Sequence, residues 1–232
     1  MLRSSVLYLL SIAIMMGILF LNPQIPSDYG VGMVVVSILA IILLSVFGLF
    51  AKSLMNYLAC SILIQLAYFF LDLSTAVLIG KSLWFAVIQF INFVIVVTPF
   101  LLFFYLFHRT LKKKLFIEYA GLYKKNQLLV LALCIIALSS GGMPGFNVFV
   151  GEFMIYSSLF AIHPFLTYFA VLAGLVCFFF YFRICYTLLV GNSKRVVYHS
   201  LPMKIVLVLF TTLSVVLGVV PQILFYVLEF YI

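Results

Sequence analysis

The sequence predicts an all-α polytopic membrane protein with about eight transmembrane helices. Of its 232 residues, 67% are hydrophobic and only 8% are charged, whereas an average soluble domain is about 45–50% apolar and about 25% charged. The mean hydropathy is +1.36. So little polar surface cannot coat a water-soluble globule, which excludes soluble enzymes, nucleic-acid-binding proteins and disordered tails.

The apolar runs are helical rather than strand-like. A membrane strand alternates polar and apolar residues, and runs such as VVVSILAIILLSVFGLF do not alternate. A helix satisfies its own backbone hydrogen bonds inside hydrocarbon. At about 20 residues per crossing, the length allows eight or nine crossings and leaves no room for a soluble domain. The expected spans, in one transmembrane domain over 1–232, are 5–21, 31–50, 53–71, 82–107, 127–141, 146–162, 164–190 and 203–227.

The connections between the spans are short or basic. NPQIPSDYG separates the first two spans, because proline and glycine end helices. The fourth and fifth spans are joined by residues 108–127, which hold six lysines and arginines against one acid, Glu118. With eight crossings, both termini share a side with this loop, and the positive-inside rule orients that side inward.

The apolar stretch 128–162 predicts a broken helix that contains a carboxylate. Its 35 residues would measure about 52 Å as one helix, which is too long for one crossing and barely enough for two. Helices interrupted by glycine and proline indicate ion paths in transporters. Glu152 follows the break, and the alternative is a glutamate facing headgroups. The residues of the break are Gly141, Gly142, Pro144 and Gly145.

Two basic residues beside or within spans leave alternatives open. Arg183 lies about eight residues before the next loop, so it either extends to the membrane interface or is a pairing or water-organising charge within the bundle. Lys52 has apolar residues on both sides with almost no loop between them. It therefore marks either a very tight turn or a lysine buried in the protein.

The span 82–107 carries two amides, Gln89 and Asn92, three residues apart and hence on one helical face. They either join helices by hydrogen bonds or line a hydrated passage. The four cysteines lie inside apolar runs without metal-site spacing, and buried cysteine behaves as a small hydrophobe. The sequence has no nucleotide-binding loop, metal cluster or catalytic triad, so we expect no cofactor and no redox chemistry in this chain.

The segment GGMPGFNVFVGEFMI, which ends just after Glu152, resembles the antiporter-like membrane subunits of respiratory complex I (NADH:ubiquinone oxidoreductase). Within that group it most resembles subunit 4, since the subunit 2 pattern, our second choice, usually carries lysine at the position of Glu152. HRT at 108–110, EYAGLYKKNQLL at 118–129, KSLMNYLACS at 52–61 and FYFRICY around Arg183 are similar to further family segments in the same order.

The resemblance matches only the C-terminal half of a usual family member, and it departs at functional positions. A family histidine is replaced by Asn92, and the charged lysine of the helix matching 5–21 is absent. A shortened organelle-encoded subunit fits these losses, as does a split gene whose other half is a separate chain.

The resemblance implies a multi-pass membrane-arm subunit of complex I in the mitochondrial inner membrane, with the bacterial inner membrane as the alternative. Its partners would be the other membrane subunits, a separate chain supplying the N-terminal half, and lipids, with no nucleic acid. Family members bind no flavin or iron–sulfur cluster, and they move protons along a hydrated axis of lysine, glutamate and histidine. Glu152 and Lys52 match two positions on that axis.

Three functions follow as hypotheses. The first is a proton-translocating subunit of the quinone-reducing enzyme, in which the protonation of Glu152 changes during turnover. The second is a structural subunit that conducts nothing, because expected charged positions are missing. The third is a free-standing cation/proton antiporter subunit.

Overall fold

The computed structural model describes residues 27–79, 84–111, 115–124, 126–191 and 201–223. The predicted span 5–21 and the last residues of the span 203–227 lie outside this part of the chain. No strand occurs among the described residues, where one isolated antiparallel bridge joins Ser53 and Leu115. The helices are α2 Ser27–Leu49, α3 Leu54–Ile79, α4 Trp84–Leu111, α5 Gln127–Ser140, α6 Asn147–Phe160, α7 Pro164–Leu189 and α8 Leu201–Val219, with short 3₁₀ turns η1 Phe116–Tyr119 and η2 Leu122–Lys124.

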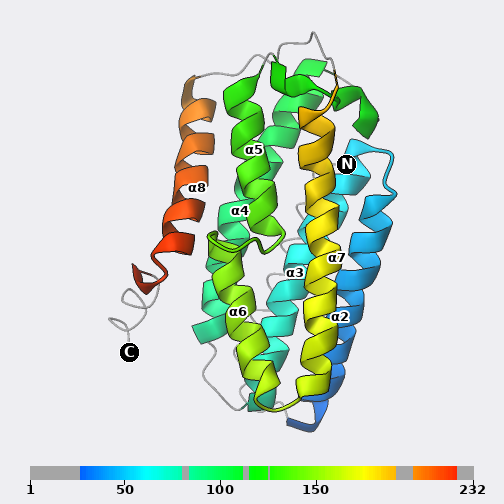
Figure 1. The fold of residues 1–232 in the computed structure, drawn as a ribbon, viewed down its shortest axis with the longest axis vertical. Helices are drawn as coiled ribbons and strands as arrows, with labels where there is room; N and C mark the ends of the chain where they lie inside the picture. Colours follow the sequence, from blue (N-terminus) through cyan, green and yellow to red (C-terminus); the bar gives the residue numbers. More distant parts are fainter. Residues whose placement is uncertain (1–26, 80–83, 112–114, 125, 192–200, 224–232) are drawn as a thin grey trace.

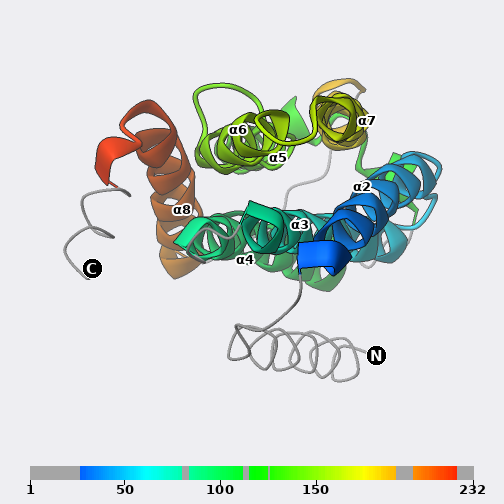
Figure 2. The same ribbon diagram turned by 90° about the horizontal axis from the view of Figure 1, so that it is seen from below.

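The helices form two layers. Figures 1 and 2 show α2, α3 and α4 side by side in one layer and α5, α6 and α7 in the other. The longest packing interface runs between α2 and α3, and α8 packs against α4, α5 and α6 at one edge. In this arrangement α5 packs against α4, α7 and α8, and α6 packs against α3, α4, α7 and α8.

The fold class predicted from sequence is confirmed, but the count of eight crossings is not. Four described helices are long and apolar enough to cross a membrane: α2, α3, α4 and α7. The helices α5 and α6 have 14 residues each, about 21 Å, against a hydrocarbon core of about 30 Å. They lie end to end (Figures 1 and 2). Neither of the spans expected at 127–141 and 146–162 therefore contains a described helix that is long enough to cross a membrane alone.

The exterior of the bundle is apolar and its polar groups lie inside. Large side chains such as Phe47, Phe165 and Tyr168 are exposed, while Gln65, Asn92 and Glu152 are buried. A soluble protein shows the reverse distribution. The inverted pattern is the one that a hydrocarbon environment requires.

The segment between α4 and α5 folds back over one end of the bundle. Phe116 donates its backbone N–H to the Lys52 carbonyl at 2.8 Å, and Gly121 donates to the Thr187 carbonyl at 3.1 Å. Phe116, Tyr119 and Leu122 are buried there. The described part of the predicted basic loop therefore closes an end of the bundle; Lys112–Lys114 and Lys125 lie outside the described residues.

Candidate functional site

The break between α5 and α6 is built by a glycine turn. Gly142 has a φ of +71°, a conformation that glycine adopts at low cost. The Met143 N–H donates to the Leu138 carbonyl at 3.1 Å, and the Gly142 N–H donates to the Ser139 carbonyl at 3.0 Å. These two bonds form a Schellman motif, which ends a helix while satisfying its last carbonyls. The predicted break is thus confirmed at residues 141–146.

A side chain from α3 donates a hydrogen bond to the last carbonyl of α5. Gln65 donates from Nε2 to the Ser140 carbonyl at 3.0 Å and to the Tyr181 hydroxyl at 3.2 Å. Tyr181 in turn donates to the Ser61 carbonyl at 3.1 Å. Since each carbonyl left unpaired in a membrane interior costs several kcal/mol, Gln65 stabilises the buried C-terminal end of α5 and connects α3 to it.

Glu152 lies on α6, buried beside this turn, with 4% of its surface exposed. Its carboxyl packs so closely on Gly142 that a Cβ there would collide with it. The Tyr156 hydroxyl donates to Oε2 at 3.5 Å, and the Tyr68 hydroxyl lies nearby, buried and without a hydrogen-bond partner among the described residues. Oε1 is buried and has no partner among the described residues. The prediction that this carboxyl faces the protein interior at the break agrees with this position.

The amide of Asn147 joins four helices on the other side of the break. It donates from Nδ2 to Asn92 Oδ1 at 2.8 Å, and its own Oδ1 accepts from Ser139 at 2.9 Å and from Ser214 at 2.6 Å. Ser214 also lies 2.9 Å from the Ser139 hydroxyl. The network connects α4, α5, α6 and α8, so it fixes the two half-helices relative to their neighbours.

Gln89 and Asn92 lie on the same face of α4, as predicted, and both are fully buried. Both polar atoms of the Gln89 amide and Nδ2 of Asn92 have no partner among the described residues. The two amides pack closely against Gly151 of α6, where an added Cβ would collide with Gln89 Oε1. Buried polar atoms are nearly always hydrogen-bonded to protein or water. Asn92 thus joins helices through its oxygen, which is the first of the two alternatives, while Gln89 and Asn92 Nδ2 have no hydrogen-bond partner among the described residues.

Arg183 caps a helix instead of pairing with an acid. Its guanidinium donates to the carbonyls of Gly48 at 2.9 Å, Leu49 at 2.6 Å and Ala51 at 2.8 Å, and it lies 4.6 Å from the centre of the Phe116 ring. The last carbonyls of a helix lack partners and carry partial negative charge. Arg183 therefore secures the C-terminal end of α2, a pairing within the bundle rather than an extension to headgroups.

Lys52 lies in the turn between α2 and α3, and its side chain is exposed. The first of the two readings, a very tight turn, is the one that the structure shows. That turn is at the end of the bundle, whereas the α5–α6 break is midway along it (Figure 1). The structure thus brings together Glu152, Gln89 and Asn92 around the start of α6, but it places Lys52 and Arg183 at the end of the bundle.

Sequence reasoning missed Asp72, Tyr68 and Asn147. Asp72 is buried on α3, with 3% of its surface exposed, but the predicted span stopped one residue before it. The available signal was the spacing of polar residues on α3 at 61, 65, 68 and 72, which repeats with the period of one helical face. Asn147 stood within the quoted motif, but nothing in its position identified its partners.

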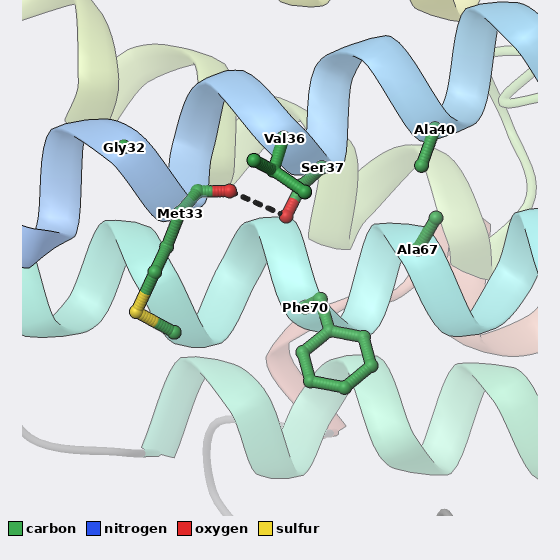
Figure 3. A pocket seen from close by; sticks show the side chains of 7 residues that line it. All are labelled: Gly32, Met33, Val36, Ser37, Ala40, Ala67 and Phe70. Carbon is green, nitrogen blue, oxygen red and sulfur yellow. Dashed lines mark hydrogen bonds between the residues drawn. The ribbon is translucent and has the colours of Figure 1, made fainter.

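An apolar groove lies outside this site, between α2 and α3. Figure 3 shows Met33, Ala40, Ala67 and Phe70 lining it. The Ser37 hydroxyl is already bonded to the Met33 carbonyl at 2.8 Å. The groove therefore offers no free polar group for a charged or polar ligand.

A buried carboxyl with two neighbouring hydroxyls and several unpaired amide atoms can hold water and pass protons. Among the described residues, no three His, Cys, Asp or Glu side chains are grouped as metal ligands.

The comparisons with known proteins agree with this architecture. The family model for the transmembrane part of NADH:quinone oxidoreductase and Mrp antiporters matches residues 1–179. No curated protein matches the chain.

Several solved structures share the fold. A chain of respiratory complex I from Thermus thermophilus with bound aureothin has a TM-score of 0.68 and 17% identity, covering 82% of this chain and 44% of that one. A chain of the Mrp complex from Dietzia sp. DQ12-45-1b has a TM-score of 0.73 and 16% identity, covering 85% and 46%. A chain of the archaeal membrane-bound sulfane sulfur reductase has a TM-score of 0.72 and 20% identity, covering 84% and 33%. This chain thus spans less than half the length of these solved chains.

Proposed function

The chain belongs to the NADH:quinone oxidoreductase/Mrp antiporter transmembrane family, and on that premise we propose that it is a proton-translocating subunit of a membrane complex. The observation that carries the proposal is the Glu152 carboxyl, buried at a broken helix with one oxygen unpaired. A carboxylate at the centre of a span costs roughly 2.5–3.5 kcal/mol on the mildest scale. Such a group needs a proton, water or a partner, and a change between these states is what proton transport uses.

The surroundings of Glu152 support transport in two ways. Gly142 and Gly151 bring the turn and α4 close to α6, and broken half-helices in transporters line cavities rather than lipid. Gln89 and Asn92 add buried donor and acceptor atoms that protein groups leave unused. Together they support a hydrated pocket on both sides of the first turns of α6.

The finer parts of the proposal concern the complex itself. We propose a respiratory complex I of the quinone-reducing type, with this chain as its subunit 4 and subunit 2 as second choice. Residue 152 is glutamate, whereas the subunit 2 pattern usually has lysine at this position. The electron chemistry would then belong to other subunits. The membrane would be the mitochondrial inner membrane, with the bacterial inner membrane as the alternative.

The basic partner of Glu152 would be an undescribed residue of this chain or a residue of a neighbouring subunit. Each lysine whose side chain the structure describes, namely Lys52, Lys124 and Lys204, is exposed, and Arg183 is engaged with α2. A positive group near Glu152 would therefore come from outside the described residues. The same observation favours the second candidate function, a structural subunit that joins its neighbours without conducting.

The variant Glu152→Gln separates the two candidates. Glutamine keeps the size of the side chain and removes its titration, so we expect normal assembly and a loss of protons moved per electron pair in the complex reconstituted into vesicles. The matched control is Glu118→Gln, at the end of the bundle, where the carboxylate accepts from the Leu115 N–H at 3.2 Å. Normal transport in Glu152→Gln would overturn the conducting role and leave the structural one.

A further inference from the structure

We propose that Asp72 is a second proton-carrying carboxyl, which connects Glu152 to the end of the bundle where α3 and α6 finish. The inference rests on the proposed function. It starts from a polar stripe on α3, a helix that is mostly apolar. The stripe consists of Ser61, Gln65, Tyr68, Asp72 and Thr75, all at most 3% exposed.

The stripe faces the broken helix. Its first two members bind the end of α5 and α7: Ser61 and Gln65 both bond to Tyr181, and Gln65 reaches the Ser140 carbonyl. Its third member, Tyr68, has its hydroxyl beside Glu152 and Tyr156. Because residues 65, 68 and 72 share one helical face, the next position along the stripe after Tyr68 is Asp72.

The stripe leads away from Glu152 toward one end of the bundle. Asp72 follows Tyr68 by four residues, about 6 Å along the helix, and precedes the end of α3 at Ile79 by about 10 Å. On α6, Tyr156 follows Glu152 by one turn in the same direction. Figure 1 shows α3 and α6 running toward the same end of the bundle, and the two helices pack together. The two tyrosines thus lie on adjacent helices along this route, and Asp72 lies further toward the end.

A structural role for Asp72 would require a partner. A buried carboxylate is normally paired or hydrogen-bonded because its desolvation is expensive. No described residue forms a hydrogen bond or ion pair with Asp72, whereas the nearby polar residues Ser74 and Thr75 each bond to the Leu71 carbonyl. A titrating group that exchanges its proton with water accounts for this difference.

The proposed step moves one proton and no electrons. Glu152 in its acid form releases a proton to the Tyr68 hydroxyl, and the same hydroxyl releases its own proton, through bridging water, toward the Asp72 carboxylate. Glu152 ends as the carboxylate, Asp72 ends as the acid, and each tyrosine stays neutral. Asp72 then exchanges its proton at the end of the bundle, and the relay is reset by reprotonation of Glu152.

The test uses Asp72→Asn in the assembled complex in vesicles. We expect assembly to be retained and proton transport to fall by roughly a hundredfold or more, the effect that a positioned proton-transfer group typically has on a rate. Asp72→Glu, which restores the carboxyl, should recover most of the transport. The matched control is Ser74→Ala, a buried polar residue at the same level whose hydroxyl is bonded to its own helix, and transport should be unchanged.

The outcomes separate this inference from the proposed function. Normal transport in Asp72→Asn together with impaired transport in Glu152→Gln overturns the relay and leaves the proposed function intact. Normal transport in both variants overturns both. If Asp72→Asn does not assemble, Tyr68→Phe decides, because it keeps the ring and removes the hydroxyl: a several-fold fall supports the relay, and unchanged transport refutes it.

Discussion

Arg183 and Glu152 are charged groups of opposite sign within the same bundle, and their surroundings differ completely. The guanidinium of Arg183 donates three hydrogen bonds to the end of α2 and stacks on Phe116. The carboxyl of Glu152 has one oxygen without a partner and a tyrosine hydroxyl at 3.5 Å from the other. A charge that only stabilises a fold is fully bonded. The comparison therefore favours a structural role for Arg183 and supports the transport role that we propose for Glu152.

The largest effect on stability is expected from Arg183→Ala. The variant leaves the carbonyls of Gly48, Leu49 and Ala51 without their donor, and hydrogen bonds to charged groups contribute about 1.5–3 kcal/mol. We expect a loss of about 2–4 kcal/mol, measured as a lower thermal midpoint and a smaller amount of assembled complex. Arg183→Lys keeps the charge but not the planar fork, so it should recover only part of the loss. A variant as stable as the wild type would contradict the structural assignment.

A smaller effect is expected from Gly142→Ala, which tests the break itself. The residue has a φ of +71°, and its new Cβ would collide with the Glu152 carboxyl. The backbone strain alone costs about 1–2 kcal/mol, and the displaced carboxyl should lower transport as well.

Gly145→Ala is the matched control for that variant. Gly145 has a φ of +94°, but nothing lies within 4 Å of the position of its Cβ, so it carries the strain without the collision. The same loss of transport in both variants would mean that contact with Glu152 is unimportant.

The smallest effect is expected from Ser214→Ala. Asn147 Oδ1 would still accept from Ser139 at 2.9 Å, and hydrogen bonds between membrane helices contribute about 0.6 kcal/mol on average. We expect a loss of about 1 kcal/mol or less in stability and normal transport per assembled complex. Asn147→Ala, which removes the whole network, should lose more. Equal losses in the two variants would show that Ser214 controls the network.

Those features of the fold that depend on one helix alone could be predicted from the sequence. The expected spans 31–50 and 164–190 agree with Ser27–Leu49 and Pro164–Leu189 because apolar length is a local property of the sequence. The glycine and proline residues likewise located the break to within a few positions. They did not reveal that α6 continues in line with α5, because the direction of the chain after a turn depends on the helices packed around it.

The candidate site could be predicted only in part for the same reason. The chemistry of a carboxylate in an apolar run identified Glu152, and spacing put Gln89 and Asn92 on one face. Lys52 and Arg183 carry charges beside or within apolar runs too, but their roles depend on which backbone carbonyls and which solvent lie nearby. Asp72 and Tyr68 needed the knowledge that α3 faces the break, which is a tertiary contact.

The most direct test of the difference between the two regions measures assembly and transport together for Glu152→Gln and Arg183→Gln in the same complex. Blue-native electrophoresis gives the amount of complex, and a pH-sensitive dye inside vesicles gives the proton flux per complex. We predict opposite patterns: Glu152→Gln keeps full assembly and loses transport, while Arg183→Gln loses assembly and keeps normal transport in each complex that forms. If Glu152→Gln instead loses assembly in proportion to transport, Glu152 is a structural residue and the central claim is contradicted.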